Sequence, residues 1–444
     1  MSSPVATRAL LAYSLPSAPI SMLMMMLVVY LAPYYAAEMH LGLAAVGLIF
    51  SVARLWDAVI DPIVGNLSDR TRSRLGRRKP WIAAGTPMLM LAVWLFFQPP
   101  EGIGIGYLAV VAFFFYVTVT MVQIPYLSWG AELSRDYHER IRINSYREGA
   151  TMIGILMVAA VPLILLRGQD ASVSDIMGVF TVLVMIMLPL TVIPALSFAP
   201  QGISVPGESL SLPRALYALR VNRPFLRLLL ASLFIWVGGN IYNATSLFLI
   251  KDALGFAPTL FLVLMATQFG VGLLTVPLVI RVGKRLGKHR TLLLMGMGFF
   301  PILWLLLLVE PQNTTQIFIV YILKGAMTAA IWIMPPALVA DSIEHGMLEG
   351  IGDDTALYMS LYFFVQKLAA AIAVGFALPL AALLGFDPGQ IESTTDFTGL
   401  KFVSVILPSL VAFPAVLLLF NYPITEQRHA EIRAQLRASG IDAG

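Results

Sequence analysis

The sequence contains no cysteine and few charged residues. Only 12% of its 444 residues are Asp, Glu, Lys or Arg, whereas soluble domains carry about 25%. Without cysteine the chain forms no disulfide and has no thiolate nucleophile or cysteine metal site. Its five histidines stand apart from one another, so no histidine-rich metal motif is present. The start, MSSPVATRALLAY, lacks a small-residue cleavage site after a short apolar core, and we expect the first apolar run to be retained.

Apolar residues dominate instead: 58% of the chain is hydrophobic and the mean hydropathy is +0.82. Runs of about 20 apolar residues cross a bilayer as helices. The sequence therefore predicts an all-α polytopic membrane protein with twelve spans, at 9–36, 43–66, 80–98, 104–130, 145–166, 174–197, 225–250, 258–280, 291–309, 315–340, 355–384 and 400–421.

The twelve spans divide into two halves. The segment 199–224 is rich in Pro, Gly and Ser and then basic, as a linker is. We expect a first six-helix bundle at 1–198, a cytoplasmic linker at 199–224, a second bundle at 225–421 and a cytoplasmic tail at 422–444. RLGRRK at 74–79 and RLGKHR at 285–290 each follow the second span of their half, which indicates two repeats.

Lys and Arg gather on one side of the predicted topology. Loops on the side of the N-terminus hold 23 of the 29 basic residues, the opposite loops hold three, and three lie inside spans. This asymmetry predicts a multi-pass protein of the plasma (inner) membrane with both termini in the cytoplasm. It also argues against nucleic acid as a partner, because the basic loops lie beside anionic lipid headgroups.

Span 2 contains the stretch RLWDAVIDPIVGNLSDR, which places three charges inside an apolar helix. Arg54, Asp57 and Asp61 lie on one helix face at about 100° per residue. A charge at the bilayer centre costs roughly 2.5–3.5 kcal/mol, so this face points to a protein interior or a wet cavity. One interpretation is a structural ion pair between Arg54 and one aspartate. The other is a cation site, since two nearby carboxylates bind a cation or hold a proton.

Other polar residues lie within the spans. Lys367 in span 11 is a candidate partner for the aspartates, and Lys324 in span 10 is expected to extend toward the interface. Thr120 and Gln123 share a face of span 4 and either line a cavity or bond between helices. Trp129 and Trp332 either stack on a substrate or pack as membrane tryptophans commonly do.

Charged residues near the cytoplasmic ends of the helices suggest a gate. Basic residues crowd around Asp69 in the first half, whereas the second half has an acidic loop after span 10. From charge sign alone we expect salt bridges between the halves. The candidates are Asp69, Arg70, Arg77, Glu132, Arg140, Asp341 and Glu344.

Several motifs together resemble a known family. WDAVIDP, GNLSDRTRSRLGRRKPW, IPYLSWGAELSRDYHERIRINSYR, ADSIEHG and YMSLYFFVQKLAAAIA occur in the order found in the melibiose permease group. This group comprises the glycoside–pentoside–hexuronide:cation symporters of the major facilitator superfamily. The resemblance implies two pseudo-symmetric bundles around a central cavity, with alternating access.

Residue roles follow from the resemblance. It implies that Asp57 and Asp61 are the cation-site carboxylates, that Thr120 helps to ligate sodium and that Lys367 couples cation to substrate. It also implies substrate contacts for Arg147 and for Trp332. Gln123 and Thr120 supply neutral oxygens to the cation if span 4 packs against span 2, as the resemblance implies.

This chain departs from the melibiose carriers at several positions. Ile60 stands where they have an asparagine cation ligand, which favours protons over sodium. Gln123 replaces an aspartate that grips sugar hydroxyls, and Leu127 replaces a stacking tryptophan. Related sodium-dependent lysophosphatidylcholine symporters suggest a second class of substrate, and the Met-rich first span would suit an amphiphile.

We therefore expect a secondary transporter that couples H+ or Na+ to a glycoside or related small solute. A lysophospholipid-like amphiphile is the alternative substrate. A channel would need a continuous polar pore, and an enzyme would need a nucleophile–base or metal constellation, which the sequence lacks at helical spacing. We expect a monomer that contacts membrane lipids and uses no cofactor beyond the coupling ion.

Overall fold

The computed structural model describes residues 5–134, 137–166, 172–202, 212–350, 355–391 and 395–438. All regular secondary structure in these ranges is helical. Twelve helical segments are long and apolar enough to cross a membrane, which confirms the predicted spans.

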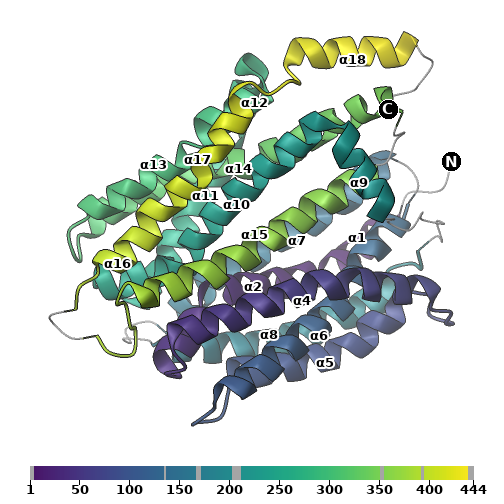
Figure 1. Cartoon of the computed structure of the whole chain (residues 1–444). Helices are drawn as coiled ribbons and strands as arrows, with labels where there is room; N and C mark the ends of the chain where they lie inside the picture. The colour runs from purple at the N-terminus through teal and green to yellow at the C-terminus, as the bar shows by residue number, and fades with distance from the viewer. Residues whose placement is uncertain are drawn as a thin grey trace.

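The first six spans form the bundle in the lower part of Figure 1, called the first bundle here. Its elements are α1 (Thr7–Ser14), α2 (Ser17–Val29), α3 (Leu31–Pro33), the π-helical turn η1 (Tyr34–Glu38), α4 (Leu43–Arg70), α5 (Lys79–Phe97), α6 (Ile105–Glu132), α7 (Tyr137–Leu165) and α8 (Val173–Phe198).

The last six spans form the second bundle, in the upper part of Figure 1. Its elements are α10 (Arg223–Phe248), η2 (Leu249–Ala253), α11 (Pro258–Leu286), α12 (Lys288–Thr291), η3 (Leu292–Gly296), α13 (Phe299–Leu303), η4 (Trp304–Leu308), α14 (Thr314–Leu348), α15 (Thr355–Leu383), α16 (Thr398–Lys401), η5 (Phe402–Ile406) and α17 (Leu407–Phe420). The domain boundaries given above stay a prediction.

Two helices lie outside the spans. Helix α9 (Leu212–Val221) occupies the predicted linker, and α18 (Glu426–Ala438) occupies the predicted tail and buries Ile432 and Leu436. Helix α14 also continues to Leu348, so the first part of the acidic segment predicted as a loop after span 10, with Asp341 and Glu344, is helical. That prediction was wrong because a hydropathy reading ends at the first charged residues, whereas a helix can continue beyond the hydrocarbon core.

The glycines of the repeated loop sequences share a positive φ angle. Gly76 in RLGRRK has φ +87° and Gly287 in RLGKHR has φ +86°, a region that favours glycine. A new helix begins shortly after each glycine, at Lys79 and at Lys288. The shared glycine conformation before a helix start supports the two-repeat interpretation of the sequence.

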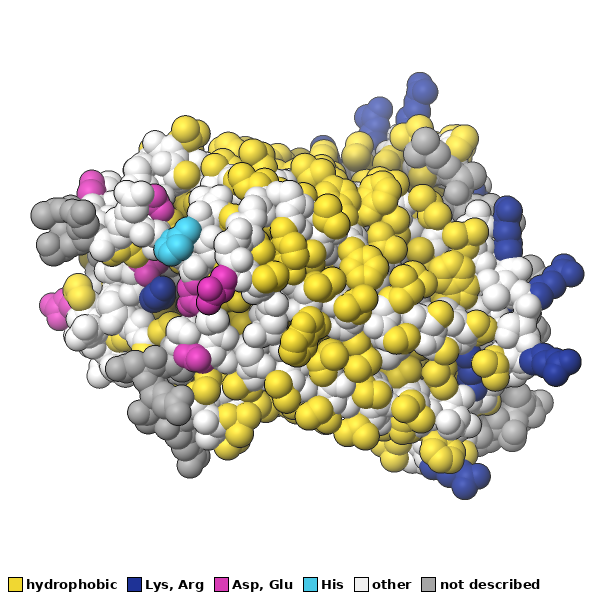
Figure 2. Space-filling model, turned by 90° about the horizontal axis from the view of Figure 1, so that it is seen from below, with side chains coloured by type: hydrophobic (Ala, Val, Ile, Leu, Met, Phe, Trp, Pro, Cys, Tyr) yellow, Lys and Arg dark blue, Asp and Glu magenta, His cyan; other side chains and the backbone are white. Residues whose placement is uncertain are grey.

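The two ends of the molecule differ in charge. Figure 2 shows Lys and Arg at one end, Asp and Glu at the other, and a broad hydrophobic surface between them. We call the end that carries loops 70–79 and 281–290 the basic end, and the opposite end the acidic end.

The bundles meet most extensively where α4 packs against α15. Near the acidic end the two helices approach so closely that glycines are required. A Cβ on Gly47 would lie 2.8 Å from the Cβ of Leu378, and one on Gly375 would lie 2.4 Å from Oγ of Ser51. Ser51 Oγ also donates a hydrogen bond to the carbonyl of Ala371 at 2.8 Å. The described state is therefore closed at its acidic end.

Replacing Gly375 by valine should prevent this closure, because the new side chain would overlap Ser51. Cysteines placed at His40 and Gly389, which lie in contact at the acidic end, provide a measurement in a chain without native cysteine. A short bifunctional thiol cross-linker should join them in the parent protein and much less in Gly375→Val. The control Gly106→Val adds the same volume where no atom lies within 4 Å of the new Cβ. Equal cross-linking in all three proteins would contradict the closure.

Candidate functional site

Two carboxylates of α4 share a hydroxyl group from α6. Asp57 and Asp61 are one helical turn apart, and Thr120 Oγ1 lies 2.9 Å from Asp57 Oδ1 and 3.1 Å from Asp61 Oδ1. The hydroxyl has a single proton and donates to one carboxylate at a time. The side chains of Asp57 and Asp61 are only 14% and 19% exposed, so this is a half-buried pair of like charges.

The positive partner comes from the other bundle. Lys367 of α15 lies with its Nζ 2.7 Å from Asp57 Oδ2, and it also pairs with Asp61. Its side chain is 34% exposed. One ammonium group thus bridges both carboxylates across the bundle interface, as the interpretation of Lys367 as their counter-charge predicted.

Arg54 and Gln123 lie outside this cluster. Arg54 donates from Nε to the Tyr116 hydroxyl at 3.2 Å, so the alternative of an Arg54–aspartate ion pair is not what the structure shows. Gln123 lies on the wall of the central cavity, and within the described residues it makes no hydrogen bond to the carboxylates. Gln123 as a cation ligand therefore stays a prediction.

A cavity of about 470 Å³ lies between the bundles. First-bundle residues from α2, α6 and α7 and second-bundle residues from α10, α11, α13 and α14 line it. The lining is largely apolar, with polar groups at a few positions, which is the composition typical of small-molecule sites.

Three of the five predicted substrate contacts line this cavity, Gln123 among them, and two do not. Arg147 lines it, with Nη2 2.6 Å from Glu148 Oε1, and Trp332 lines it beside Trp236, edge to face at 5.0 Å between ring centroids. Lys367 does not line the cavity and stays with the carboxylates.

Trp129 is also outside the cavity. It is 1% exposed, donates from Nε1 to the carbonyl of Pro200 at 2.9 Å, and packs edge to face against Tyr13. Its ring face also lies 5.1 Å from Lys79 Nζ, so in this state Trp129 is a packing residue, and its contact with substrate stays a prediction.

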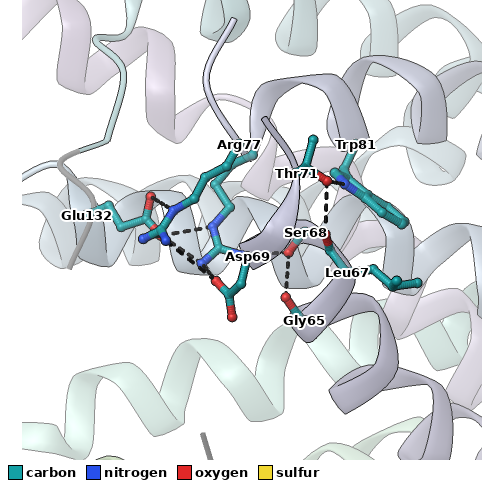
Figure 3. Close-up of polar contacts among 9 residues, drawn as sticks. Gly65, Leu67, Ser68, Asp69, Thr71, Arg77, Trp81 and Glu132 are labelled. Atoms are coloured by element: carbon teal, nitrogen blue, oxygen red, sulfur yellow. Dashed lines mark hydrogen bonds and ion pairs between the residues drawn. The ribbon is translucent and has the colours of Figure 1, made fainter. Parts of the chain in front are cut away.

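Three of the gate candidates of the first bundle, Asp69, Arg77 and Glu132, form a cluster within that bundle (Figure 3). Glu132 of α6 accepts from Arg77 Nη2 at 2.8 Å and from Arg78 Nε at 2.9 Å. Arg78 also pairs with Asp69 and donates to Ser68 Oγ at 2.6 Å. We call Glu132, Arg77, Arg78 and Asp69 the first clasp.

The second bundle has a related cluster. Lys288 Nζ lies 2.5 Å from Asp341 Oδ1, and His429 Nε2 and Arg433 Nη2 lie 2.9 and 2.7 Å from the carboxylate of Glu344. The hydrogen bond to Glu344 raises the pKa of Arg433, which lies in the tail helix. We call these five residues the second clasp.

The salt bridges predicted between the halves at the basic end are absent from the described residues. The first clasp pairs acid with base inside the first bundle, and the second pairs acids of α14 with bases of the second bundle and the tail helix. Charge sign alone cannot separate the two arrangements, since each bundle supplies both signs. Arg70 is exposed at the end of α4, and the side chain of Arg140 lies outside the described part of the structure. A role for these residues as a gate stays a prediction.

Sequence reasoning missed a polar cluster in the second bundle. Lys324 was expected to extend toward the interface, but it is fully buried and donates to the hydroxyl of Tyr242 at 2.6 Å. Asn240 and Asn243, which line the cavity, were not considered. Their spacing of three residues within an apolar span is the signal that points to a polar helix face.

Twelve spanning helices in two related bundles, with a cavity and a charge cluster between them, define a membrane transporter of the major facilitator fold. A family model described as MFS/sugar transport protein matches residues 12–426, and the chain belongs to this family. Its members are transporters rather than enzymes. The family resemblance inferred from the motifs is thereby confirmed.

Relatives span almost the whole chain. A glucuronide carrier protein homolog of Escherichia coli (strain K12) is 25% identical and covers 98% of this chain and 96% of its own length. A sodium-dependent lysophosphatidylcholine symporter 1-B of Danio rerio is 22% identical, covering 90% of this chain and 82% of its own. The crystal structure of a D-xylose-proton symporter shares the fold, with a TM-score of 0.62 at 17% identity over 95% of this chain and 97% of its own.

Removing the shared acid of the first clasp should destabilise the protein. Glu132→Gln leaves Arg77 and Arg78, which are 19% and 7% exposed, without their common carboxylate. Breaking a buried pair by removing one partner costs about 3 kcal/mol. We expect a clearly lower thermal unfolding midpoint in detergent solution.

The matched control is Glu431→Gln, which removes a carboxylate that is 59% exposed and paired with Arg428 three residues away. An exposed pair of this kind contributes about 0.5 kcal/mol or less. If both variants unfold at the same temperature, the first clasp does not stabilise the bundle.

Proposed function

We propose that the protein is a cation-coupled symporter that carries a sugar or sugar derivative by alternating access, with both termini in the cytoplasm. The observation that carries this proposal is the bridge from Lys367 to both carboxylates across the bundle interface. A cation site formed by one bundle and occupied by a lysine of the other ties ion binding to the relative position of the bundles.

In the proposed cycle, Lys367 and the cation exclude one another. The ammonium group occupies the position between Asp57 and Asp61 that an incoming cation would take. A proton or sodium ion on the carboxylates removes the charge that holds Lys367, and its departure restores the bridge. The bridge compensates the carboxylates in the empty carrier, which can then reorient without exposing unpaired charge to the membrane.

The oxygens around the site favour protons. Among the described side chains, the carboxylates of Asp57 and Asp61 and the hydroxyl of Thr120 bring oxygens to this site, and the neighbouring Ile60 supplies none. Sodium would need further ligands, whereas two carboxylates one turn apart can share a proton. We propose that protons drive transport at least in part.

The cavity fits a substrate of sugar size. Its volume of about 470 Å³ lies within the roughly 300–1,000 Å³ of small-molecule sites. Trp332 offers an exposed ring for stacking, and Asn243 and Gln123 offer hydrogen-bonding groups. The family description and the glucuronide carrier homolog support a sugar. An amphiphile is the second candidate, because Met24, Met25 and other apolar side chains line the first-bundle wall.

Uptake into proteoliposomes tests the coupling ion. With an inward proton gradient and no sodium, we expect radiolabelled glucose, xylose or glucuronate to accumulate above its external concentration. Collapsing the gradient with a protonophore should abolish accumulation. Uptake that needs sodium and scales with it at constant pH would contradict proton coupling.

Asp61→Asn and Asp57→Asn should each lose gradient-driven accumulation while remaining monodisperse, because a neutral amide neither takes up a proton nor forms an ion pair with Lys367.

The orientation rests on the 23 basic residues that the predicted cytoplasmic loops hold and on the charge difference between the ends (Figure 2). A single cysteine at Arg437 in the tail should resist an impermeant thiol reagent in intact cells. One at Pro311, at the acidic end before α14, should react. Permeabilised cells provide the control that both thiols are reactive. The reverse labelling pattern would overturn the proposed topology.

A further inference from the structure

A fully buried lysine lies against the central cavity, away from the cation site. Lys324 of α14 is 0% exposed. Its Nζ lies 4.0 Å from the ring centroid of Tyr242, 3.8 Å from that of Tyr321 and 5.8 Å from that of Phe299. All three aromatic residues line the cavity, and so does Thr328, one turn after Lys324.

Within the described residues, Lys324 has no carboxylate partner. Two other lysines between the helices have more acceptors: Lys367, which is 34% exposed, has two carboxylates, and the buried Lys79 donates to the carbonyls of Leu196 and Ala199 at 2.8 and 2.7 Å. An ionisable side chain at membrane depth is costly, and an uncompensated one indicates a function.

The cluster has more hydrogen-bond donors than acceptors. Lys324 Nζ donates one of its hydrogens to the Tyr242 hydroxyl at 2.6 Å, and the Tyr242 and Tyr321 hydroxyls lie 2.9 Å apart. Two phenol groups have two hydrogens, but a single bond between them uses one. Among the described residues, no acceptor is recorded for the remaining phenol hydrogen. A ligand that completes this cluster must therefore supply acceptor oxygens.

A further buried hydroxyl belongs to the same region. Tyr30 of the first bundle is 0% exposed, and its hydroxyl has no hydrogen-bond partner in the described structure. Its ring packs edge to face against Phe261, which lines the cavity. Arg147, the cation among the lining residues, is already paired with Glu148.

We propose that Lys324, Tyr242 and Tyr321 form a subsite for a carboxylate group of the substrate, on the second-bundle wall of the cavity. The carboxylate accepts from the free phenol hydrogen, and the ammonium group behind the tyrosines provides the compensating positive charge. This inference rests on the proposed function, and it makes the cluster the determinant that selects acidic over neutral substrates.

Two probes that differ mainly by the carboxylate test the subsite: phenyl β-glucuronide and phenyl β-glucoside. Their dissociation constants are measured by isothermal titration calorimetry with the purified full-length protein. We expect the parent protein to bind the glucuronide about tenfold or more tightly, as hydrogen bonds to a charged group imply. Lys324→Met should remove most of this preference. Tyr321→Phe, which keeps the ring and loses the hydroxyl, should reduce it. The ratio is taken within each variant, so a general loss of affinity cancels.

Lys401→Met is the matched control, because it removes one positive charge from the second bundle at its acidic end, away from the cavity lining. It should keep the parent ratio. Equal affinity for both probes in the parent, an unchanged ratio in Lys324→Met and Tyr321→Phe, or the same loss in Lys401→Met would overturn the subsite while leaving sugar transport standing. Failure of the parent to bind either probe would count against both proposals.

Discussion

The bridge from Lys367 to Asp57 and Asp61 is the contact on which the arrangement of the two bundles depends. Two carboxylates at membrane depth need a compensating charge, because an unpaired ion in this environment is costly. The first bundle supplies the neutral Thr120, and the compensating ammonium comes from the second bundle. The electrostatic requirement of one bundle is therefore met only when the other is in place. Any cation that binds to the carboxylates therefore changes the electrostatic contact between the bundles.

The clasps are of a different kind from the bridge. Glu132 with Arg77 and Arg78, and Asp341 with Lys288, tie the ends of helices within one bundle. Such pairs stay intact when one bundle moves against the other. The bridge and the close packing of Gly47 and Gly375 are the contacts that a rigid-body motion must break. Stiff bundles and an exchangeable interface are what alternating access requires.

Sequence predicted those parts of the structure that local rules determine. Apolar runs gave the twelve spans, and helical periodicity placed Asp57 and Asp61 on one face with Lys367 as their counter-charge. The contacts that it did not predict depend on packing between distant segments. Trp129 is buried by Tyr13 and Pro200, and the clasps pair acids with bases of their own bundle. Neither residue spacing nor charge sign predicts these contacts. The same holds for the aromatic rings that surround Lys324.

The two lysines of the second bundle together suggest why an acidic substrate suits this carrier. In the two proposed sites of the empty carrier, with both lysines protonated, two carboxylates and two ammonium groups would sum to zero charge. A monovalent cation alone leaves one extra positive charge, and a carboxylate substrate alone leaves one extra negative charge. Only the empty and the doubly loaded carrier share the same net charge, whatever constant charge Arg54 adds. Since moving a net charge through the membrane interior is costly, the two proposed sites would favour reorientation of these two states and disfavour uncoupled leakage of either partner.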